Sequence, residues 1–501
     1  MFLVRPRLVD FKIIGYYLGK IILGIGYMMA IPLFISLFNQ EWASALDFVI
    51  GVGLSLSIGY LLLLVCRTGR DIGWIHGVLV VPVAWLAAMV LGAVPLYLSG
   101  HFLSFLDALF DTMSGFATTG LTLIQDLDHL SYGHNFWRHL TMFIGGQGIV
   151  VITITLIAGG ASGIYGMYIG EAREEKILPN LVQTARVIWL VSFIFLGTGT
   201  ITLWLVGWQA GMPPLRALFH GMMVFMAAFD TGGFSPQSQS ILYYHSIAYE
   251  FATIPFMVAG ALNFALHYAL FTGNHREIFK NAETLTLAIT IALLFALTAG
   301  GLSQLGVYGD TVSLFRRGFY QIISAHTGTG FMTIYGAQFP NLWGPFAMLG
   351  VAFAMGLGAS AGSTAGGIKA LRVVTMWKSF VLEIKRMVLP PSAVIVEKYH
   401  HLKENVIEER LLLNAFFISS AYILTYVSGG VIGTYLGYPF VNSLFESISA
   451  AANVGLTSGV TAPSMPDALK VVYIIEMWVG RLEFLSIMAL VGYALSVVRG
   501  K

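Results

Sequence analysis

Long apolar stretches alternate with short polar connections along most of the chain. A predominantly apolar run of about 20 residues is the length that a helix needs to cross a bilayer. Ten such runs each predict a transmembrane helix: 13–38, 44–66, 74–99, 136–160, 183–208, 246–272, 283–306, 341–379, 411–436 and 469–498. The pattern therefore predicts an all-α polytopic membrane protein.

The composition agrees with a chain that lies mostly in lipid. Hydrophobic residues make up 57% of the 501 residues and charged residues only 10%, whereas a soluble domain carries roughly 25% charged residues. The net charge of +2 is small, and no basic stripe indicates a nucleic-acid partner. Cys66 is the only cysteine, which excludes an internal disulfide.

Basic residues gather in alternate connections. By the positive-inside rule, the connections rich in Lys and Arg, and with them both termini, are expected on the cytoplasmic side. These basic residues are Arg5, Arg7, Arg67, Arg70, Arg173, Lys176, Arg186, Arg276, Lys280, Lys385, Arg386, Lys398, Lys403, Arg410, Arg499 and Lys501.

The opposite connections carry mainly acids. The acids are Glu41, Asp47, Asp126 and Asp128, and the few basic residues are Arg138, Arg216, Arg316, Arg317 and Lys470. Two interpretations stay open: an acidic outer mouth that attracts cations, or ordinary solvated loop charges.

Four shorter semi-apolar segments, each of about 15 residues, lie between the third and fourth, fifth and sixth, seventh and eighth, and ninth and tenth runs. They are too short to cross the membrane. Their endings are ATTGLT, DTGGFS, TGTGFM and ANVGLT, which align on Gly120, Gly233, Gly330 and Gly455. Six residues earlier stand Ser114, Ala227, Ser324 and Ser449, and ten residues earlier Phe110, Met223, Tyr320 and Phe445. A helix, short helix, loop, helix unit therefore occurs four times.

The chemistry of these loops favours a cation. An irregular loop at membrane depth is tolerated only where it is buried in protein or lines a water-filled cavity. Inside a pore, its carbonyl oxygens can replace the hydration shell of an ion, and glycine permits the backbone conformations that aim them inward. The short helices end beside these loops, and their C-termini carry partial negative charge. Connecting turns are the alternative interpretation.

These motifs carry a family resemblance over essentially the whole chain. With the four loops, GGQGIV at 145–150, GALNFALHY at 260–268, GLGASAGSTAGGIK at 356–369 and GRLE at 480–483, the chain resembles the Trk/Ktr/HKT superfamily of potassium transporters, most closely the TrkH-type membrane subunit. The resemblance implies one pore of four pseudo-equivalent units with a glycine of each loop in the filter. We expect K⁺ to be bound by Thr118, Thr119, Gly120, Thr231, Gly232, Gly233, Gly328, Thr329, Gly330, Asn453, Val454 and Gly455.

The filter sequence leaves two interpretations of ion selectivity open. Glycine at all four aligned positions resembles the potassium-favouring pattern, whereas serine at the first goes with sodium preference in the plant branch of the superfamily. TrkH-type fourth loops usually read NVGPG, while Leu456 and Thr457 follow Gly455 here. A less selective K⁺/Na⁺ transporter therefore stays an alternative.

The repeats and the resemblance together suggest a division of the chain. We expect an N-terminal helix pair at 1–70, pore repeats at 71–170, 180–275, 280–385 and 409–501, and a cytoplasmic loop at 386–408.

The eighth apolar run contains many small residues, and glycine is a poor helix former. We expect its middle to be unwound, with close helix packing through small residues as the alternative. The resemblance implies an intramembrane loop that obstructs the pore, and a barrier arginine below the filter. The gate residues expected on this basis are Gly358, Ser360, Gly362, Ser363, Gly366, Gly367, Lys369 and Arg481.

Other intramembrane polar residues have competing interpretations. Arg481 has no acidic partner at helical spacing, so we expect a partner on another segment or a position facing the pore, with a buried structural ion pair as the alternative. His220, His267 and His326 are candidates for proton coupling or for simple interior hydrogen bonds. Asp230 either biases cation entry or caps a turn.

The chain shows no set of residues with acid, base or ligand spacing, so we expect no enzyme. We expect K⁺ as the transported ion and no organic cofactor. The resemblance implies a homodimer in the bacterial inner membrane, surrounded by lipid and docked on a cytosolic nucleotide-binding subunit of the TrkA type. A secondary transporter of an organic solute is the alternative from another class, and coupling of flux to protons or sodium stays open.

Overall fold

The computed structural model describes residues 7–149, 151, 162–173, 177, 178, 180–390 and 396–499. The second half of the predicted fourth span lies outside these residues, as do Val150 of the GGQGIV motif and the charged residues Arg5, Lys176 and Lys501. The side chain of Arg499 also lies outside them.

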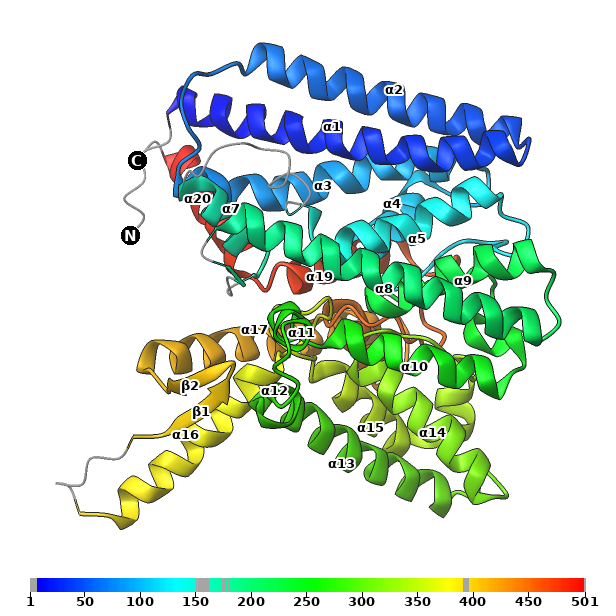
Figure 1. Ribbon diagram of the computed structural model, residues 1–501, viewed down its shortest axis with the longest axis vertical. Helices are drawn as coiled ribbons and strands as arrows, with labels where there is room; N and C mark the ends of the chain where they lie inside the picture. The colour runs from blue at the N-terminus through cyan, green and yellow to red at the C-terminus, as the bar shows by residue number, and fades with distance from the viewer. Residues whose placement is uncertain are drawn as a thin grey trace.

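The first two helices form a hairpin at one edge of the molecule (Figure 1). α1 (Leu8–Phe38) and α2 (Trp42–Val65) run side by side and contact α3. They approach closely at small residues, since a β-carbon on Gly19 would lie 3.0 Å from the carbonyl oxygen of Gly59. Close packing of this kind is how helices associate in lipid.

The remaining helices form the predicted fourfold repeat. Each unit has a long first helix, a short pore helix and a second helix that is broken. The first helices are α3 (Trp74–Leu98), α8 (Leu181–Gln209), α13 (Ala282–Gln304) and α17 (Glu409–Tyr435). The pore helices are α4 (Phe105–Phe116), α9 (Pro214–Phe229), α14 (Thr311–His326) and α18 (Phe440–Ala451), of 12 or 16 residues.

The second helices are interrupted near their middle. α10 (Ile247–Ala261) and α11 (Phe264–Phe271) meet at 103°, and α19 (Asp467–Arg481) and α20 (Leu485–Arg499) at 110°. In the first repeat α5 (Tyr132–Gln147) ends at the glycine-rich motif and α7 (Ser162–Gly170) follows. In the third, α15 (Gly344–Gly356) and α16 (Ala370–Val388) are separated by a non-helical segment. The predicted interruption of the eighth run is therefore confirmed.

Within the described residues, six helices are long and apolar enough to cross a membrane, and the two bent pairs could add two more. The ten continuous spans predicted from hydropathy are thus too simple. The run at 341–379 is two helices and a loop, and the run at 136–160 is described as a helix only to Gln147. Hydropathy reports how apolar a run of residues is, and it does not reveal a non-helical break inside that run.

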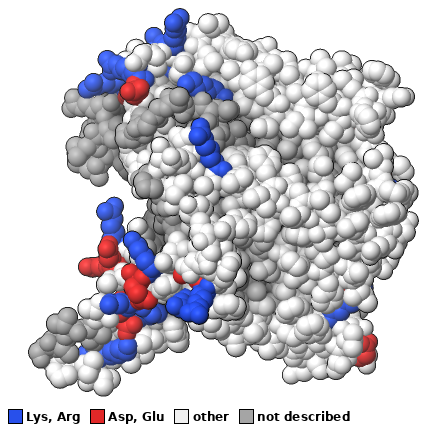
Figure 2. All heavy atoms as spheres, in the orientation of Figure 1, with Lys and Arg blue, Asp and Glu red and all other residues white. Residues whose placement is uncertain are grey.

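Most of the charge on the face seen in Figure 2 lies at one end, and a second, small charged patch lies at the lower right. Lys, Arg, Asp and Glu gather beside the ends of α1 and α20 and around α16, while most of the face is uncharged. The start of α1 and the end of α20 lie at this same end, since the rings of Phe11 and Tyr493 are 6.1 Å apart. Large apolar side chains such as Leu190, Leu293 and Leu424 are exposed, as expected for a lipid-facing surface.

The connection after α16 contains the single sheet among the described residues. β1 (Lys398–His401) pairs antiparallel with β2 (Lys403–Val406), and the hairpin lies next to α16 and α12 (Glu277–Lys280) in Figure 1. The expected cytoplasmic loop at 386–408 thus contains a β-hairpin formed by residues 398–401 and 403–406.

Candidate ion pathway

All four pore helices end in a loop of the same backbone geometry. Two residues before each aligned glycine the chain enters the left-handed region, at Thr118 (φ 52°), Thr231 (50°), Gly328 (79°) and Asn453 (56°). The aligned glycines are left-handed too, with φ between 71° and 96°. This shared conformation places the four loops in one structural class, as their alignment predicts.

The residue six positions before each glycine fixes the loop. Ser114 accepts from Thr119 N (2.8 Å) through its carbonyl and from Gly120 N (3.0 Å) through its hydroxyl. Ser449 does the same for Val454 and Gly455. In the other two repeats the carbonyl oxygens of Ala227 and Ser324 accept both amides. The sequence repeat at this position thus has a structural cause.

The four loops close into a ring. A β-carbon on Gly120 would overlap the carbonyl oxygen of Gly232, and one on Gly233 would overlap that of Thr329. A β-carbon on Gly330 would overlap the carbonyl oxygen of Val454, and one on Gly455 would overlap that of Thr119. Each overlapped residue directly precedes the aligned glycine of the next repeat, in the order 1, 2, 3, 4 and back to 1. Only a shared central axis produces this cycle.

The non-helical segment 357–369 lies against three loops of the ring. Thr364 Oγ1 is 3.1 Å from Thr231 Oγ1 in the second loop. Ala365 Cβ is 3.3 Å from a β-carbon placed on Gly328 in the third loop, and a β-carbon on Gly366 would overlap the carbonyl oxygen of Ala452 beside the fourth. The segment therefore sits under the ring.

Arg481 connects this segment to the first loop. Its guanidinium donates to Thr118 Oγ1 (3.2 Å), to the carbonyl oxygen of Thr364, and to the carbonyl oxygens of Gly145 (2.6 Å) and Gly146 (3.3 Å). The expectation of a partner on another segment is confirmed, since these acceptors come from the first and third repeats. The alternative of an ion pair as its partner is not supported, because the guanidinium donates to a hydroxyl and to carbonyl oxygens.

A second charged group holds the far end of the segment. Lys369 donates to the carbonyl oxygen of Ala365, and its Nζ is 3.8 Å from Glu483 Oε1. Glu483 also pairs with Arg372 of α16. The GRLE motif thus separates two roles: Arg481 faces the ring, and Glu483 fixes the exit of the segment.

The three histidines considered as candidates for proton coupling are hydrogen-bonded in the interior. His220 Nδ1 is 3.0 Å from Tyr244 OH, His267 Nε2 is 2.8 Å from the carbonyl oxygen of Ala259, and His326 Nε2 is 2.6 Å from Thr290 Oγ1. These contacts favour the structural interpretation. Asp230, at the end of α9, accepts from Gln147 Nε2 (2.7 Å) and so links the second repeat to the first.

Several charges assigned to outer loops have defined structural partners. Arg138 is fully buried and pairs with Asp111 (2.9 Å), and buried Lys470 pairs with Asp107 (2.7 Å). The interpretation as solvated loop charges is wrong for these two basic residues, because each neutralises a buried acid.

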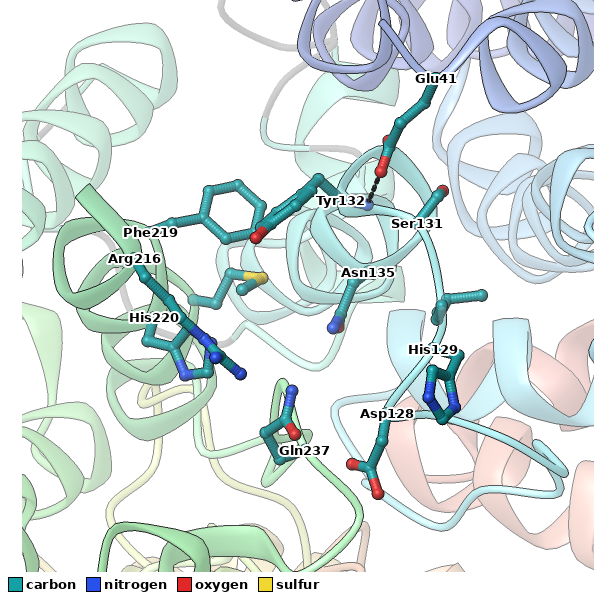
Figure 3. Close-up of a pocket in the computed structure, with 12 residues that line it drawn as sticks. Glu41, Asp128, His129, Ser131, Tyr132, Asn135, Arg216, Phe219, His220 and Gln237 are labelled. Atoms are coloured by element: carbon teal, nitrogen blue, oxygen red, sulfur yellow. Dashed lines mark hydrogen bonds between the residues drawn. The ribbon is translucent and has the colours of Figure 1, made fainter. Parts of the chain in front are cut away.

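A cavity of about 250 Å³ lies between the starts of α5 and α9 (Figure 3). Arg216 and His220 line one side, and Glu41 and Asp128 lie on the other. Glu41 accepts from the backbone amide of Tyr132 (2.8 Å), and Asp128 from that of Ser238 (2.8 Å). Both acids therefore hold loop backbone in place.

Sequence reasoning missed two residues at this site. Thr364 donates to the carbonyl oxygens of Phe229 (3.0 Å) and Gly260 (2.9 Å), and Asn263 donates to that of Ala361 (2.6 Å). Both stand inside motifs that the sequence singled out. A side chain able to hydrogen-bond within an otherwise small, apolar run was the signal that could have found them.

The chain is similar to known cation transport proteins. The family model described as TrkH, cation transport protein, matches residues 45–303 and 282–493. An uncharacterized cation transporter of Methanocaldococcus jannaschii is 30% identical over 485 residues, covering 96% of this chain and 95% of the relative. The Trk system potassium uptake protein TrkH of Escherichia coli strain K12 is 27% identical, covering 96% and 98%.

A solved structure agrees with these relatives. The crystal structure of the potassium transporter TrkH from Vibrio parahaemolyticus superposes with a TM-score of 0.81 at 26% identity, covering 96% of this chain and 98% of that one. This fold is that of a transporter rather than an enzyme. From the family model and these relatives together we conclude that the chain belongs to the TrkH family of cation transport proteins.

Proposed function

We propose that the protein takes up potassium across the cytoplasmic membrane through one central pore whose filter is the ring of four loops. The observation that carries this proposal is the cycle of close approaches in which each aligned glycine faces a carbonyl oxygen of the next repeat. A ring of backbone carbonyls is the arrangement that replaces the water shell of an alkali ion.

The ion ligands in this proposal are the expected filter residues. Backbone carbonyls and threonine hydroxyls would contact K⁺, and the side chains at these positions are buried. Asn453 supports the ring, because its Nδ2 donates to Thr119 Oγ1 (3.1 Å) and to the carbonyl oxygen of Met477 (3.0 Å).

The segment 357–369 is the proposed gate. Its contacts with the second, third and fourth loops, together with Arg481 at the first, support a position in the path of an ion leaving the filter. The guanidinium adds an electrostatic barrier, since a cation below the filter meets a fixed positive charge. For ions to pass, the segment has to move.

We also propose a homodimer in the inner membrane, with both termini cytoplasmic and a cytosolic nucleotide-binding subunit of the TrkA type. The names of the curated relatives place them in a Trk system. α16 and the β1–β2 hairpin support such docking, because they extend from the helical body at its charged end (Figures 1 and 2).

Purified protein reconstituted in liposomes tests the transport proposal. We expect potassium uptake that exceeds sodium uptake. An imposed proton gradient separates a channel, which ignores it, from a symporter, which uses it to accumulate potassium. Equal potassium and sodium uptake would favour the less selective transporter, and no cation uptake would favour the transporter of an organic solute.

Shortening the segment 358–367 tests the gate. We expect potassium flux to rise, because the obstruction under the ring is removed. Unchanged or abolished flux in a folded, monodisperse variant would contradict the proposed role of this segment.

A further inference from the structure

The peptide groups of Ala361, in the middle of the proposed gate, are held from two sides. Its N–H donates to Glu283 Oε1 (2.7 Å), and its carbonyl oxygen accepts from Asn263 Nδ2 (2.6 Å). Glu283 is in the first turn of α13, and Asn263 is at the break between α10 and α11. A hydrogen bond to a carboxylate is roughly twice as strong as one between neutral groups. Glu283 is therefore the stronger of these two anchors.

The same carboxylate faces the cytoplasmic hairpin. Glu283 Oε2 lies 3.5 Å from His401 Nδ1, and the two side chains are only 1% and 6% exposed. His401 is the last residue of β1, and α13 contacts this strand. One buried side chain thus touches the gate with one oxygen and the hairpin with the other.

A second acid fixes the tip of the hairpin to the same region. Glu277 of α12 accepts from Leu402 N (3.0 Å) and lies 3.1 Å from His400 Nε2. Asn281 Oδ1 accepts from Glu283 N (3.0 Å) and lies 3.4 Å from His401 Nδ1. The tip of the hairpin is therefore docked at the start of α13, next to Glu283.

We propose that Glu283 is a positioning residue that couples the β1–β2 hairpin to the gate. Displacing the hairpin pulls on the carboxylate, weakens its hold on Ala361 and favours movement of the segment 357–369. Glycine and other small residues give that segment little conformational preference of its own, so its anchors decide where it lies. The inference rests on the proposed function, because it requires that this segment obstruct the pore.

Potassium flux through reconstituted full-length variants tests the coupling. Glu283→Ala removes the acceptor for Ala361 and should raise flux by about tenfold, the shift expected from losing one hydrogen bond to a charged group. Glu283→Gln keeps an acceptor oxygen without the charge and should give a flux between those of the wild type and Glu283→Ala. Lys280→Ala is the matched control, because this exposed residue is on the same segment and is three residues away.

The hairpin side of the link needs its own variant. His401→Ala keeps the acceptor for Ala361 but removes the hairpin contact that orients the Glu283 carboxylate, so we expect flux to rise by less than in Glu283→Ala. In the Glu283→Ala background the same substitution should add nothing, because the link is already cut. Multiplicative effects of the two substitutions would overturn the coupling, and so would unchanged flux in His401→Ala.

Arg481→Ala separates failure of this inference from failure of the proposed function. If Arg481→Ala raises flux and neither Glu283→Ala nor His401→Ala does, the coupling is wrong and the gate stands. If Glu283→Ala does not fold, the His401→Ala result decides. If no variant conducts potassium, the proposed function fails, and this inference fails with it.

Discussion

The guanidinium of Arg481 donates a hydrogen bond to the hydroxyl of Thr118, with Nη1 3.2 Å from Oγ1, although 363 positions separate the two residues in the chain. The bond joins the broken second helix of the fourth repeat to the loop of the first. The same guanidinium also donates to the carbonyl oxygen of Thr364. One side chain of the fourth repeat therefore contacts both the loop of the first repeat and the segment 357–369.

Arg481→Ala should increase potassium leak through reconstituted protein by about tenfold or more. A unit charge a few ångströms from the ion path opposes a cation by on the order of a few kcal/mol at a protein-like dielectric. Tracer uptake into potassium-loaded liposomes measures the change. Arg481→Lys keeps the charge and should leak much less, and equal leak in both variants would show that charge is not the barrier.

Gly455→Ala should reduce potassium uptake by about tenfold or more. The new methyl group would overlap the carbonyl oxygen of Thr119, and overpacking typically costs about 1–3 kcal/mol. Gly300→Ala is the matched control, since a β-carbon there meets nothing within 4 Å and the residue is helical. Wild-type uptake by Gly455→Ala would argue against the ring as the conduction site.

Arg138→Leu should lower stability by about 3–5 kcal/mol, because it leaves the buried Asp111 carboxylate without its partner. Thermal unfolding in detergent measures the loss. The double variant Arg138→Leu, Asp111→Leu should recover much of it, since replacing both members of a buried pair with apolar residues is often close to neutral. A double variant less stable than the single one would contradict the argument.

Docking of the hairpin should weaken as the pH rises. The hydrogen bond with Glu277 raises the pKa of His400 above its ordinary value, and Glu404 adds to this shift. A raised pKa in the docked state means that the stabilisation is complete below about pH 6.5, the ordinary histidine value. It is lost as the pH climbs through the raised pKa and the imidazolium loses its proton.

Amide hydrogen exchange of residues 398–406, corrected for the intrinsic rate at each pH, measures this effect. Exchange protection should be greater at pH 6 than at pH 9. His400→Gln should remove the difference between the two conditions. A difference that persists in His400→Gln would assign the pH dependence to another group.

Elements determined by local pattern were predictable from the sequence. Apolar runs of sufficient length gave α1, α2, α3, α8, α13 and α17, because a helix that crosses lipid must satisfy its own backbone and be apolar along its length. Alignment on Gly120 and its three counterparts gave the four loops, because each repeat needs the same left-handed backbone at the same position. The unwinding of the eighth run followed from glycine content alone.

Contacts between repeats could not be predicted in this way. Nothing near Arg481 in the chain identifies Thr118 as its acceptor, and no spacing rule places Ala361 between Glu283 and Asn263. Sequence also misassigned Arg138, whose partner Asp111 is 27 residues away on a pore helix. These pairs are set by how four separate units pack around one axis.

The sequence by itself determined that this protein crosses a membrane, that it contains four copies of one unit, and which residue of each copy adopts the left-handed turn. Hydropathy and backbone preference are properties of a few consecutive residues, so the local sequence alone determines them. Only the tertiary structure decided which carbonyl faces which glycine, what lies under the ring, and which buried charges hold it there. Those contacts join residues that are far apart in the chain, so they form only when the repeats pack together.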